Sequence, residues 1–290
     1  MAGTRIARDI SYAGSARTRG GRAMIRMLEN ATGRLAVIRR AEGYEHEVAN
    51  GGCFWEVLAD RYRLSLDVIG GSLENIPREG AVIVVANHPY GILDGLMMGR
   101  ILSSRRSDFR ILANSVFRRA EALNRVILPI SFDETREAVR LNLETREAAL
   151  AHLRAGGAMG VFPGGTVSTA LRPFTRPMDP GWRNFTAKMV AKSGAAVVPV
   201  FFDGHNSRLF QLASHLHQTL RLALLIKEFR ARIGGPVRVA IGEPIAGDDL
   251  QRFRSDPKGM MDFLRRATYD LSPEPFGHDY GFEFDTKYKG

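Results

Sequence analysis

The sequence predicts an α/β fold. Short apolar runs rich in Val and Ile, which are typical of buried strands, alternate with longer segments whose apolar residues recur at helical spacing. The chain has 290 residues, 44% of them hydrophobic, so it can bury a large core as one α/β domain. Its one cysteine, Cys53, cannot form an internal disulfide, as expected for a protein of a reducing compartment.

The clearest strand is the run AVIVVA at 81–86. A polar tip with Asn87, His88 and Asp94 follows it, and residues 95–102 have the pattern of a helix. Open α/β sheets bind their ligands at the carboxyl ends of strands. This tip is therefore the first candidate site.

An imidazole and a carboxylate in one loop indicate a general base. Neutral His88 can accept a proton near neutral pH, and Asp94 at its other ring nitrogen would fix the tautomer and stabilise the imidazolium. No serine or cysteine is required if the nucleophile is a substrate hydroxyl. General base catalysis contributes about 10²–10⁴-fold in rate. The alternative is a loop histidine beside an aspartate that caps the next helix.

The rest of the chain divides into three parts. We expect a basic, amphipathic arm at 1–50, the α/β core at 51–250, and a C-terminal helix and tail at 251–290. Residues 54–69 are predicted to be a helix that runs into a strand. The other expected strands are 109–113, 126–132, 159–162, 196–202 and 237–241. The other expected helices are 115–123, 134–154, 185–193 and 259–269.

Two segments have apolar residues interleaved with arginine. Residues 1–44 hold nine arginines against three acids, and we interpret them as an arm on a membrane surface or as a solvated tail. Residues 208–233 predict a helical segment that packs on the core or leaves apolar surface for lipid. His215 and His217 in this segment point in different directions on a helix, so no metal site is predicted.

A glycine-rich loop follows the expected strand 159–162. Gly164 and Gly165 let the backbone pass close to a substrate, and successive amides there can bind an anion. Thr166 and Ser168 add hydroxyl groups. The alternative is an ordinary glycine turn. Further along, Pro199 lies inside an expected strand, where proline requires an edge or a bulge, and we interpret it as part of a pocket wall.

Four segments resemble, in order and spacing, the blocks of the glycerolipid and lysophospholipid acyltransferase family. They are Asn-His-Pro followed by Asp94, ANSVF at 113–117, VFPGGTVS at 161–168 and VVPVFFDGHNS at 197–207. The resemblance covers about residues 60 to 250. His88 and Asp94 are separated by one residue more than in most members, which is similar to the hemolysin-like acyltransferases and the O-acyltransferases of ornithine lipid synthesis.

The resemblance implies a single-domain αβ acyltransferase fold with a mixed central sheet, flanking helices and a basic helical N-terminal arm. It implies acyl transfer from acyl carrier protein or coenzyme A to a lipid hydroxyl, with His88 as base and Asp94 as its partner. No metal and no bound cofactor are expected. The implied substrate-binding residues are Asn87, Asn114, Phe162, Pro163, Gly164, Gly165, Thr166, Ser168, Arg118, Arg119 and Pro199.

The third block departs from the family pattern. Members that acylate glycerol phosphates have Phe-Pro-Glu-Gly-Thr-Arg-Ser here, whereas this chain has Gly164 for the acid and Val167 for the arginine. A buried phosphate without charged partners is costly. We therefore expect a lyso-aminolipid acceptor such as lyso-ornithine lipid, with lysophosphatidate as the alternative. Arg118, Arg119 and Arg125 are candidates for a replacement cation.

The formal charge of +10 indicates an anionic partner. Anionic membrane lipids and an acidic acyl carrier protein fit this charge, and no nucleic-acid-binding motif is present. No signal peptide and no apolar run of about 18 residues is found, so we expect a cytoplasmic protein, peripheral on the inner face of the cell membrane. A non-catalytic protein that binds anionic lipid or nucleic acid is the remaining alternative.

Overall fold

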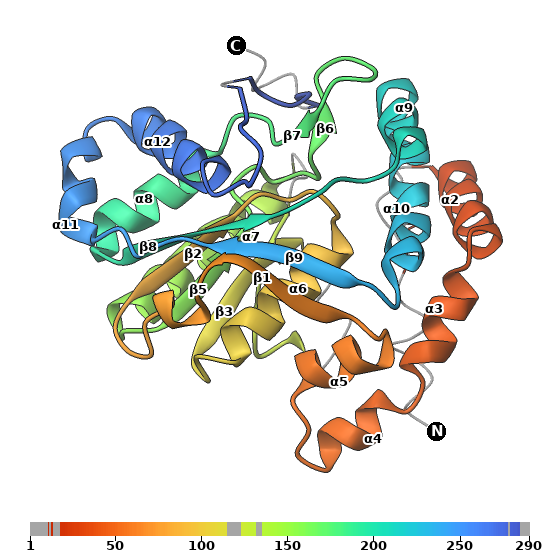
Figure 1. Cartoon of the computed structure of the whole chain (residues 1–290), viewed down its shortest axis with the longest axis horizontal. Coiled ribbons are helices and arrows are strands. Elements are labelled where there is room, and N and C mark those ends of the chain that lie inside the picture. Colours follow the sequence, from red (N-terminus) through yellow and green to blue (C-terminus); the bar gives the residue numbers. More distant parts are fainter. Residues whose placement is uncertain are drawn as a thin grey trace.

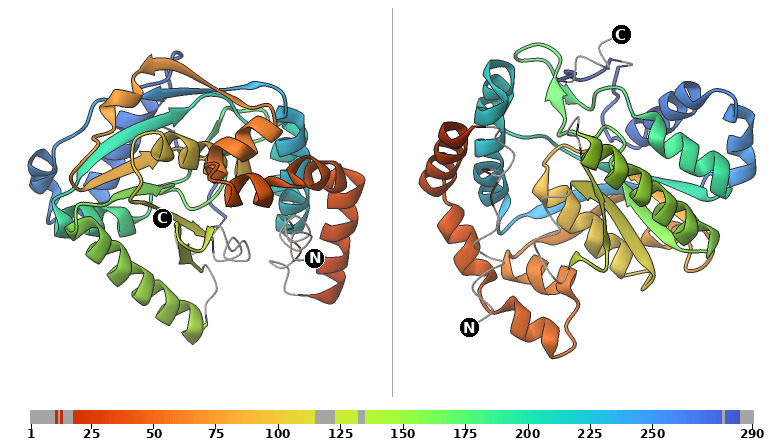
Figure 2. Two further views of the ribbon diagram at one scale, coloured as in Figure 1. Left: turned by 90° about the horizontal axis from the view of Figure 1, so that it is seen from below. Right: turned by 180° about the vertical axis from the view of Figure 1, so that it is seen from behind.

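The computed structural model describes residues 11, 13, 18–114, 123–131, 135–277 and 279–284 (Figure 1). The helix expected at 115–123, apart from its last residue, lies outside these residues, as do Arg118 and Arg119. The described residues form a central sheet with helices on both faces (Figures 1 and 2).

The central sheet has seven strands in the order β1-β9-β8-β2-β5-β3-β4. Neighbouring strands run parallel, except that β8 and β9 are antiparallel. The strands are β1 (Ser65–Gly71), β2 (Val82–Ala86), β3 (Phe109–Asn114), β4 (Ile127–Ile130), β5 (Ala158–Val161), β8 (Ala196–Phe202) and β9 (Pro236–Ile241). The predicted α/β fold with a mixed sheet is therefore confirmed.

Helices cover both faces of this sheet. One face is covered by α5 (Phe54–Arg61), α6 (Ile92–Ser103) and α10 (Gln218–Arg232). The other face is covered by α7 (Arg136–Arg154), α8 (Asn184–Ser193) and α12 (Pro257–Tyr269). The remaining elements are α2 (Arg19–Ala31), α3 (Arg34–Ala41), α4 (Tyr44–Ala49), η2 (Leu73–Asn75), α9 (Arg208–Leu216), α11 (Gly247–Leu250), η5 (Gln251–Phe253) and the short strands β6 (Thr169–Ala170) and β7 (Pro177–Met178). Within the described ranges, no helix has the length and apolar character needed to cross a bilayer.

Strand β2 lies in the middle of the sheet and is buried along its whole length. Successive side chains of a strand point to opposite faces. Val84 and Ala86 accordingly pack into one helical layer, and Ile83 and Val85 into the other. A strand covered on both sides has a continuous apolar sequence, which is why this segment was readable from the sequence.

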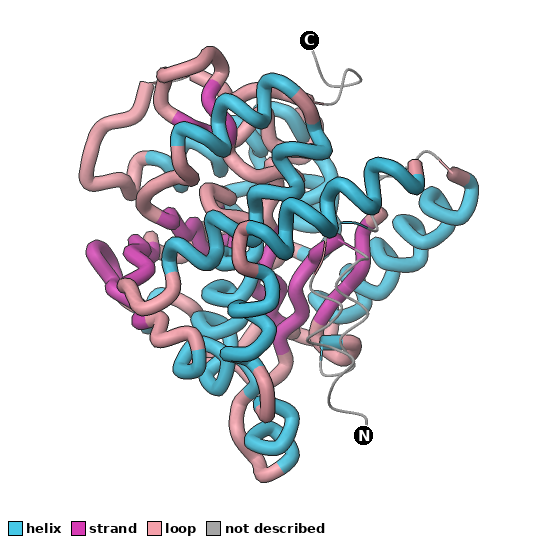
Figure 3. The backbone as a smooth tube through the Cα atoms, turned by 90° about the vertical axis from the view of Figure 1, so that its right-hand side faces the viewer, coloured by secondary structure: helices cyan, strands magenta, loops and turns pink. Residues whose placement is uncertain are grey.

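The first helices of the chain pack against α10. Ile25 is fully buried and lies in an apolar cluster with Ala223 of α10. Gly33, with φ of 113°, separates α2 from α3, and a Cβ atom there would lie 2.4 Å from the Arg230 side chain. From Arg19 on, the predicted arm is thus largely helical, and Figure 3 shows these helices facing the viewer. Its contact with a membrane stays a prediction.

Pro199 lies in β8, an interior strand of the sheet. Val197 pairs with Ile245 and Val200 pairs with Ile241. Two residues of β8 lie between these two pairs, whereas the facing chain has three. The extra residue forms a bulge where the proline has no N–H to donate. The ring of Pro199 lies close to Gly242, and Pro199 pairs with Val85 of β2.

The close packing of α6 on α5 allows a paired test. A Cβ atom on Gly99 would lie 2.1 Å from the Trp55 ring, whereas a Cβ atom on Gly95 of the same helix meets nothing within 4 Å. We expect Gly99→Ala to lower the free energy of unfolding by about 1–3 kcal/mol through overpacking. Gly95→Ala is expected to raise it by up to about 1 kcal/mol through helix propensity.

Urea unfolding of both variants measures this difference. Equal effects of the two substitutions would contradict the close contact between Gly99 and Trp55.

Candidate active site

The candidate site lies where β2, β5 and β8 end at their carboxyl edge. His88 follows β2, the loop 162–168 follows β5, and Asp203 follows β8. Because β2 pairs in parallel with both neighbours, the segments that leave these strands emerge at the same side of the sheet (Figure 1). The fold therefore gathers three of the four motif segments.

His88 and Asp94 are in contact. Nδ1 of His88 lies 2.9 Å from Oδ2 of Asp94, and the His88 side chain is 19% exposed, whereas Asp94 is fully buried. The same Asp94 oxygen accepts the N–H groups of Tyr90 (2.8 Å) and Gly91 (2.9 Å) at the start of α6. Asp94 thus caps the helix and also contacts the imidazole. This geometry fits both interpretations left open by the sequence, and the role of His88 as a general base stays a prediction.

The contact between the two side chains is not aligned as a hydrogen bond. Nδ1 of His88 and the second oxygen of Asp94 have no hydrogen-bond partner among the described residues. Burial raises the pKa of Asp94, and the nearby imidazole and the two amide groups oppose this rise. A positive charge on His88 would be stabilised by the buried carboxylate, which is what a general base requires in the transition state.

Two further predicted residues surround the imidazole. The Phe162 ring stacks on the His88 ring, with 4.3 Å between centroids and 28° between planes. Asn87 bridges β2 to β8, because its amide donates to the Phe202 carbonyl (2.9 Å) and accepts from the Phe202 N–H (2.7 Å). Asn87 therefore fixes the strand ends that carry the site.

A buried carboxylate that the sequence analysis did not single out connects the loops. Asp179 is fully buried. Its Oδ1 accepts the backbone N–H of His88 (3.1 Å) and the Ser168 hydroxyl, and its Oδ2 accepts the indole N–H of Trp182 (2.9 Å). The N–H of Ser168 also donates to the His88 carbonyl (2.8 Å). Asp179 and Ser168 hold the two loops together.

Asp179 also explains one departure from the family pattern. A Cβ atom on Gly164 would lie 3.2 Å from Cγ and Oδ2 of Asp179. The Asp179 carboxylate thus lies next to the position where family members carry an acidic side chain. Gly165 has a φ of 67° and donates its N–H to the Phe162 carbonyl (3.0 Å), whereas the Gly164 N–H has no acceptor among the described residues.

A cation reaches the same loop from α10. The buried guanidinium of Arg221 donates to Thr169 Oγ1, to Thr166 Oγ1 (2.9 Å) and to the Val167 carbonyl (2.6 Å). The Arg221 guanidinium therefore provides a positive charge at this loop, although position 167 itself is valine. Residue 221 is more than 50 positions from the loop, and only the tertiary fold brings it there.

The remaining predicted residues lie further out. Asn114 ends β3, on the far side of β5 from β2, and Arg125 is exposed before β4. The Pro163 carbonyl accepts the Arg183 N–H (2.9 Å), which connects the loop to α8. The described part of the chain has no cluster of His, Cys, Asp or Glu suited to a metal ion.

The geometry defines a site that can activate a hydroxyl group by general base catalysis. Residues 58–274 match the model of the Acyltransferase family. The chain belongs to this family and is an acyltransferase, which confirms the resemblance noted in the sequence.

Two relatives bear the name lyso-glycine lipid O-acyltransferase. The one from Phocaeicola vulgatus is 25% identical over 208 residues, covering 69% of this chain and 71% of the relative. The one from Bacteroides thetaiotaomicron is 24% identical over 207 residues, covering 69% and 73%. Among solved structures, the 1-acyl-sn-glycerophosphate (LPA) acyltransferase PlsC of Thermotoga maritima aligns with a TM-score of 0.45 and 18% identity, over 91% of this chain and 87% of that chain.

The raised pKa of Asp94 predicts a characteristic pH dependence of stability. Its folded pKa is above the unfolded value of about 4, so the native state binds this proton more tightly and loses stability as the pH rises from about 4 through the folded pKa. The variant Asp94→Asn has no carboxyl group here, so it should not lose stability in this way as the pH rises. We expect the free energy of unfolding of the variant, relative to wild type, to increase over that window in urea titrations.

Asp108 provides a control of opposite sign. The Arg106 guanidinium lowers the pKa of Asp108, so the stabilisation from this carboxylate is present above its unfolded pKa and lost as the pH falls. Asp108→Asn should therefore lose stability relative to wild type as the pH rises. Slopes of the same sign for the two variants would contradict the assignment for Asp94.

Removal of the Asp179 carboxylate is expected to lower kcat. Asp179→Ala frees the His88 backbone and the Ser168 side chain, and a displacement of about 1 Å costs about 10²-fold in rate. Asp179→Asn keeps the oxygen that accepts from both groups, so its kcat should lie between those of wild type and Asp179→Ala. Steady-state kinetics on variants with native circular dichroism would test this order, and equal kcat values for the two folded variants would contradict it.

Proposed function

We propose that this acyltransferase transfers a fatty acyl group from a thioester, on acyl carrier protein or coenzyme A, to the hydroxyl of a lyso-lipid in membrane lipid biosynthesis. The observation that carries the proposal is the partly exposed imidazole of His88 on the buried Asp94 carboxylate, in a chain of the acyltransferase family. The names of the two relatives support a lyso-lipid as the acceptor.

In the proposed reaction, Nε2 of His88 takes the proton of the acceptor hydroxyl as its oxygen attacks the thioester carbonyl. Asp94 stabilises the resulting imidazolium. When the tetrahedral intermediate collapses, the C–S bond breaks, the ester forms, and the carrier thiolate takes the proton from His88. The Gly164 N–H, which has no acceptor among the described residues, is our candidate donor to the oxyanion.

For the acceptor we propose a lyso-aminolipid, such as lyso-ornithine or lyso-glycine lipid. Gly164 and Val167 replace the acid and the arginine of members that acylate glycerol phosphates. The names of both relatives fit the same class of acceptor. The Arg221 guanidinium at this loop favours an anionic headgroup of some kind, so lysophosphatidate is the competing acceptor.

We further propose that the protein works in the cytoplasm as a peripheral protein of the inner membrane face. The acceptor is a membrane lipid under this proposal, and the net charge of +10 favours a surface rich in anionic lipids.

An assay with purified protein tests the function. Long-chain acyl carrier protein and acyl coenzyme A are each offered with lyso-ornithine lipid, lyso-glycine lipid and lysophosphatidate. We expect aminolipid acylation that falls by at least about 10²-fold in His88→Ala, because the general base is lost. His46→Ala, which changes an exposed histidine of α4, serves as the matched control and should keep wild-type turnover.

The outcomes separate the alternatives. Turnover on lysophosphatidate alone would exclude the aminolipid proposal and retain the acyltransferase mechanism. Wild-type turnover in His88→Ala would exclude the mechanism. No turnover on any pair of substrates, with well-folded protein, would favour a non-catalytic protein that binds anionic lipid.

A further inference from the structure

The hairpin between β6 and β7 carries an unusually exposed apolar tip. Residues 171–176, Leu-Arg-Pro-Phe-Thr-Arg, are all exposed, and the loop projects from the body of the molecule (Figure 1). The Phe174 side chain is 77% exposed and its backbone has a φ of 72°, in the left-handed region that a bulky residue rarely adopts. Packing within the chain does not account for a large aromatic ring held outward in this way.

Helix α9 presents an apolar stripe beside this hairpin. Leu209, Leu212 and Leu216 are spaced for one face of a helix, and their exposed fractions are 52%, 38% and 77%. The opposite face, with Phe210, packs into the protein. The stripe is therefore an outward apolar surface, additional to the face that stabilises the fold.

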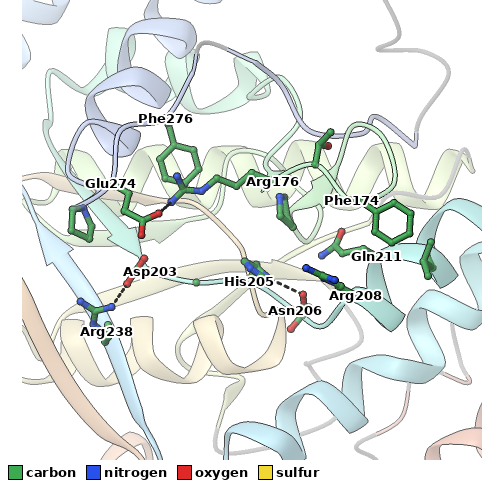
Figure 4. A pocket seen from close by; sticks show the side chains of 15 residues that line it. Phe174, Arg176, Asp203, His205, Asn206, Arg208, Gln211, Arg238, Glu274 and Phe276 are labelled. Carbon is green, nitrogen blue, oxygen red and sulfur yellow. Dashed lines mark hydrogen bonds and ion pairs between the residues drawn. The ribbon is translucent and has the colours of Figure 1, made fainter.

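The hairpin and α9 form one surface. The side chain of Gln211 accepts the N–H of Ala170 (3.0 Å), which fixes the helix against the hairpin stem. Phe174 and Leu212 line the same groove, of about 650 Å³, together with the charged side chains of Arg176 and Arg208 (Figure 4). Apolar side chains and cations therefore lie next to each other on this face.

The charges of this face match an anionic surface. Segments 171–176 and 208–217 contain Arg172, Arg176 and Arg208 and no acidic residue. The acids that line the groove are already paired, Glu274 with Arg176 (3.4 Å) and Asp203 with Arg238. The Arg208 side chain is exposed and forms no ion pair with any described residue, so its charge is available to a partner. Exposed apolar groups bordered by arginine are typical of proteins that bind at the membrane interface.

We propose that the tip of the β6–β7 hairpin and the outward stripe of α9 dock on an anionic lipid bilayer. This inference rests on the proposed function, since it assumes that the acceptor is a membrane lipid. Phe174 and the leucines enter the boundary between headgroups and acyl chains, and Arg172 and Arg208 contact anionic headgroups.

The docking face is connected directly to the candidate active site. The first strand of the hairpin, β6, follows Ser168, and the second strand, β7, precedes Asp179. Ser168 and Asp179 form hydrogen bonds to each other and to the His88 backbone. A membrane bound at the hairpin tip is thus about one hairpin length from the loops of the site. The surface would bring the site to its lipid acceptor without a spanning helix.

Co-sedimentation with vesicles tests the docking face. Wild-type protein is expected to bind vesicles of phosphatidylcholine and phosphatidylglycerol, and to bind pure phosphatidylcholine vesicles more weakly. The variant Phe174→Asp/Leu216→Asp should bind at least about tenfold more weakly, because two apolar anchors become anions. Arg172→Glu and Arg208→Glu should each weaken binding by about fivefold and reduce its salt dependence.

A second pair of exposed apolar residues provides the matched control. Val139 and Leu143 on α7 are 57% and 50% exposed, and α7 packs on β4, β5 and α8. Val139→Asp/Leu143→Asp should bind vesicles like wild type. If the control loses binding as strongly as the hairpin and α9 variant, or if that variant binds like wild type, the proposal is wrong.

Activity measurements separate this proposal from the catalytic one. With acceptor dispersed in detergent, Phe174→Asp/Leu216→Asp should keep wild-type turnover, and it should lose turnover only when the acceptor is in vesicles. His88→Ala should lose turnover in both. If vesicle binding is unchanged but the KM for acyl carrier protein rises in the variant, the face binds the acidic carrier instead, and the membrane proposal is overturned.

Discussion

The buried carboxylate of Asp179 is the interaction on which the arrangement of the site depends. It accepts hydrogen bonds from a backbone N–H, a hydroxyl and an indole N–H, which belong to three different segments of the chain. A buried charge is costly to desolvate, and several well-placed donors offset that cost only while all of them stay in place. The loops after β2 and β5 are therefore fixed relative to each other by Asp179 together with the backbone hydrogen bond from Ser168 to His88, and Gly164 leaves the space that the carboxylate needs.

Much of this arrangement was predictable because it is local in the sequence. The apolar run of β2 and the periodic pattern of α7 identified their elements, since burial on both faces and helical spacing leave clear patterns. His88 and Asp94 were recognised as a pair because only a short loop separates them. The Asp94 carboxylate also accepts backbone N–H groups at the start of α6, so local and tertiary requirements agree at this point.

The parts that sequence did not reveal come from distant positions. Asp179 lies 91 residues after His88, in a segment with no motif, and Arg221 reaches the glycine loop from a helix whose sequence is typical of ordinary packing. The nearest sequence signal for Asp179 was Trp182, three residues later. An aspartate three residues before a tryptophan is too common to indicate a buried site by itself. Pro199 itself indicated an edge or a bulge, but the chain that forms the bulge, which follows β9, could not be identified from the sequence.

The capping role of Asp94 constrains how this loop can change in length. Asp94 is fixed at the third residue of α6, and its carboxylate is held there by the N–H groups of Tyr90 and Gly91. Gly91 enters the helix with a φ of 85°, a conformation that glycine adopts without strain. A residue gained or lost between His88 and Asp94 must therefore be absorbed by the few residues before the helix, not by the helix itself. Histidine-to-aspartate spacings that differ by one residue can in this way present the same pair of functional groups.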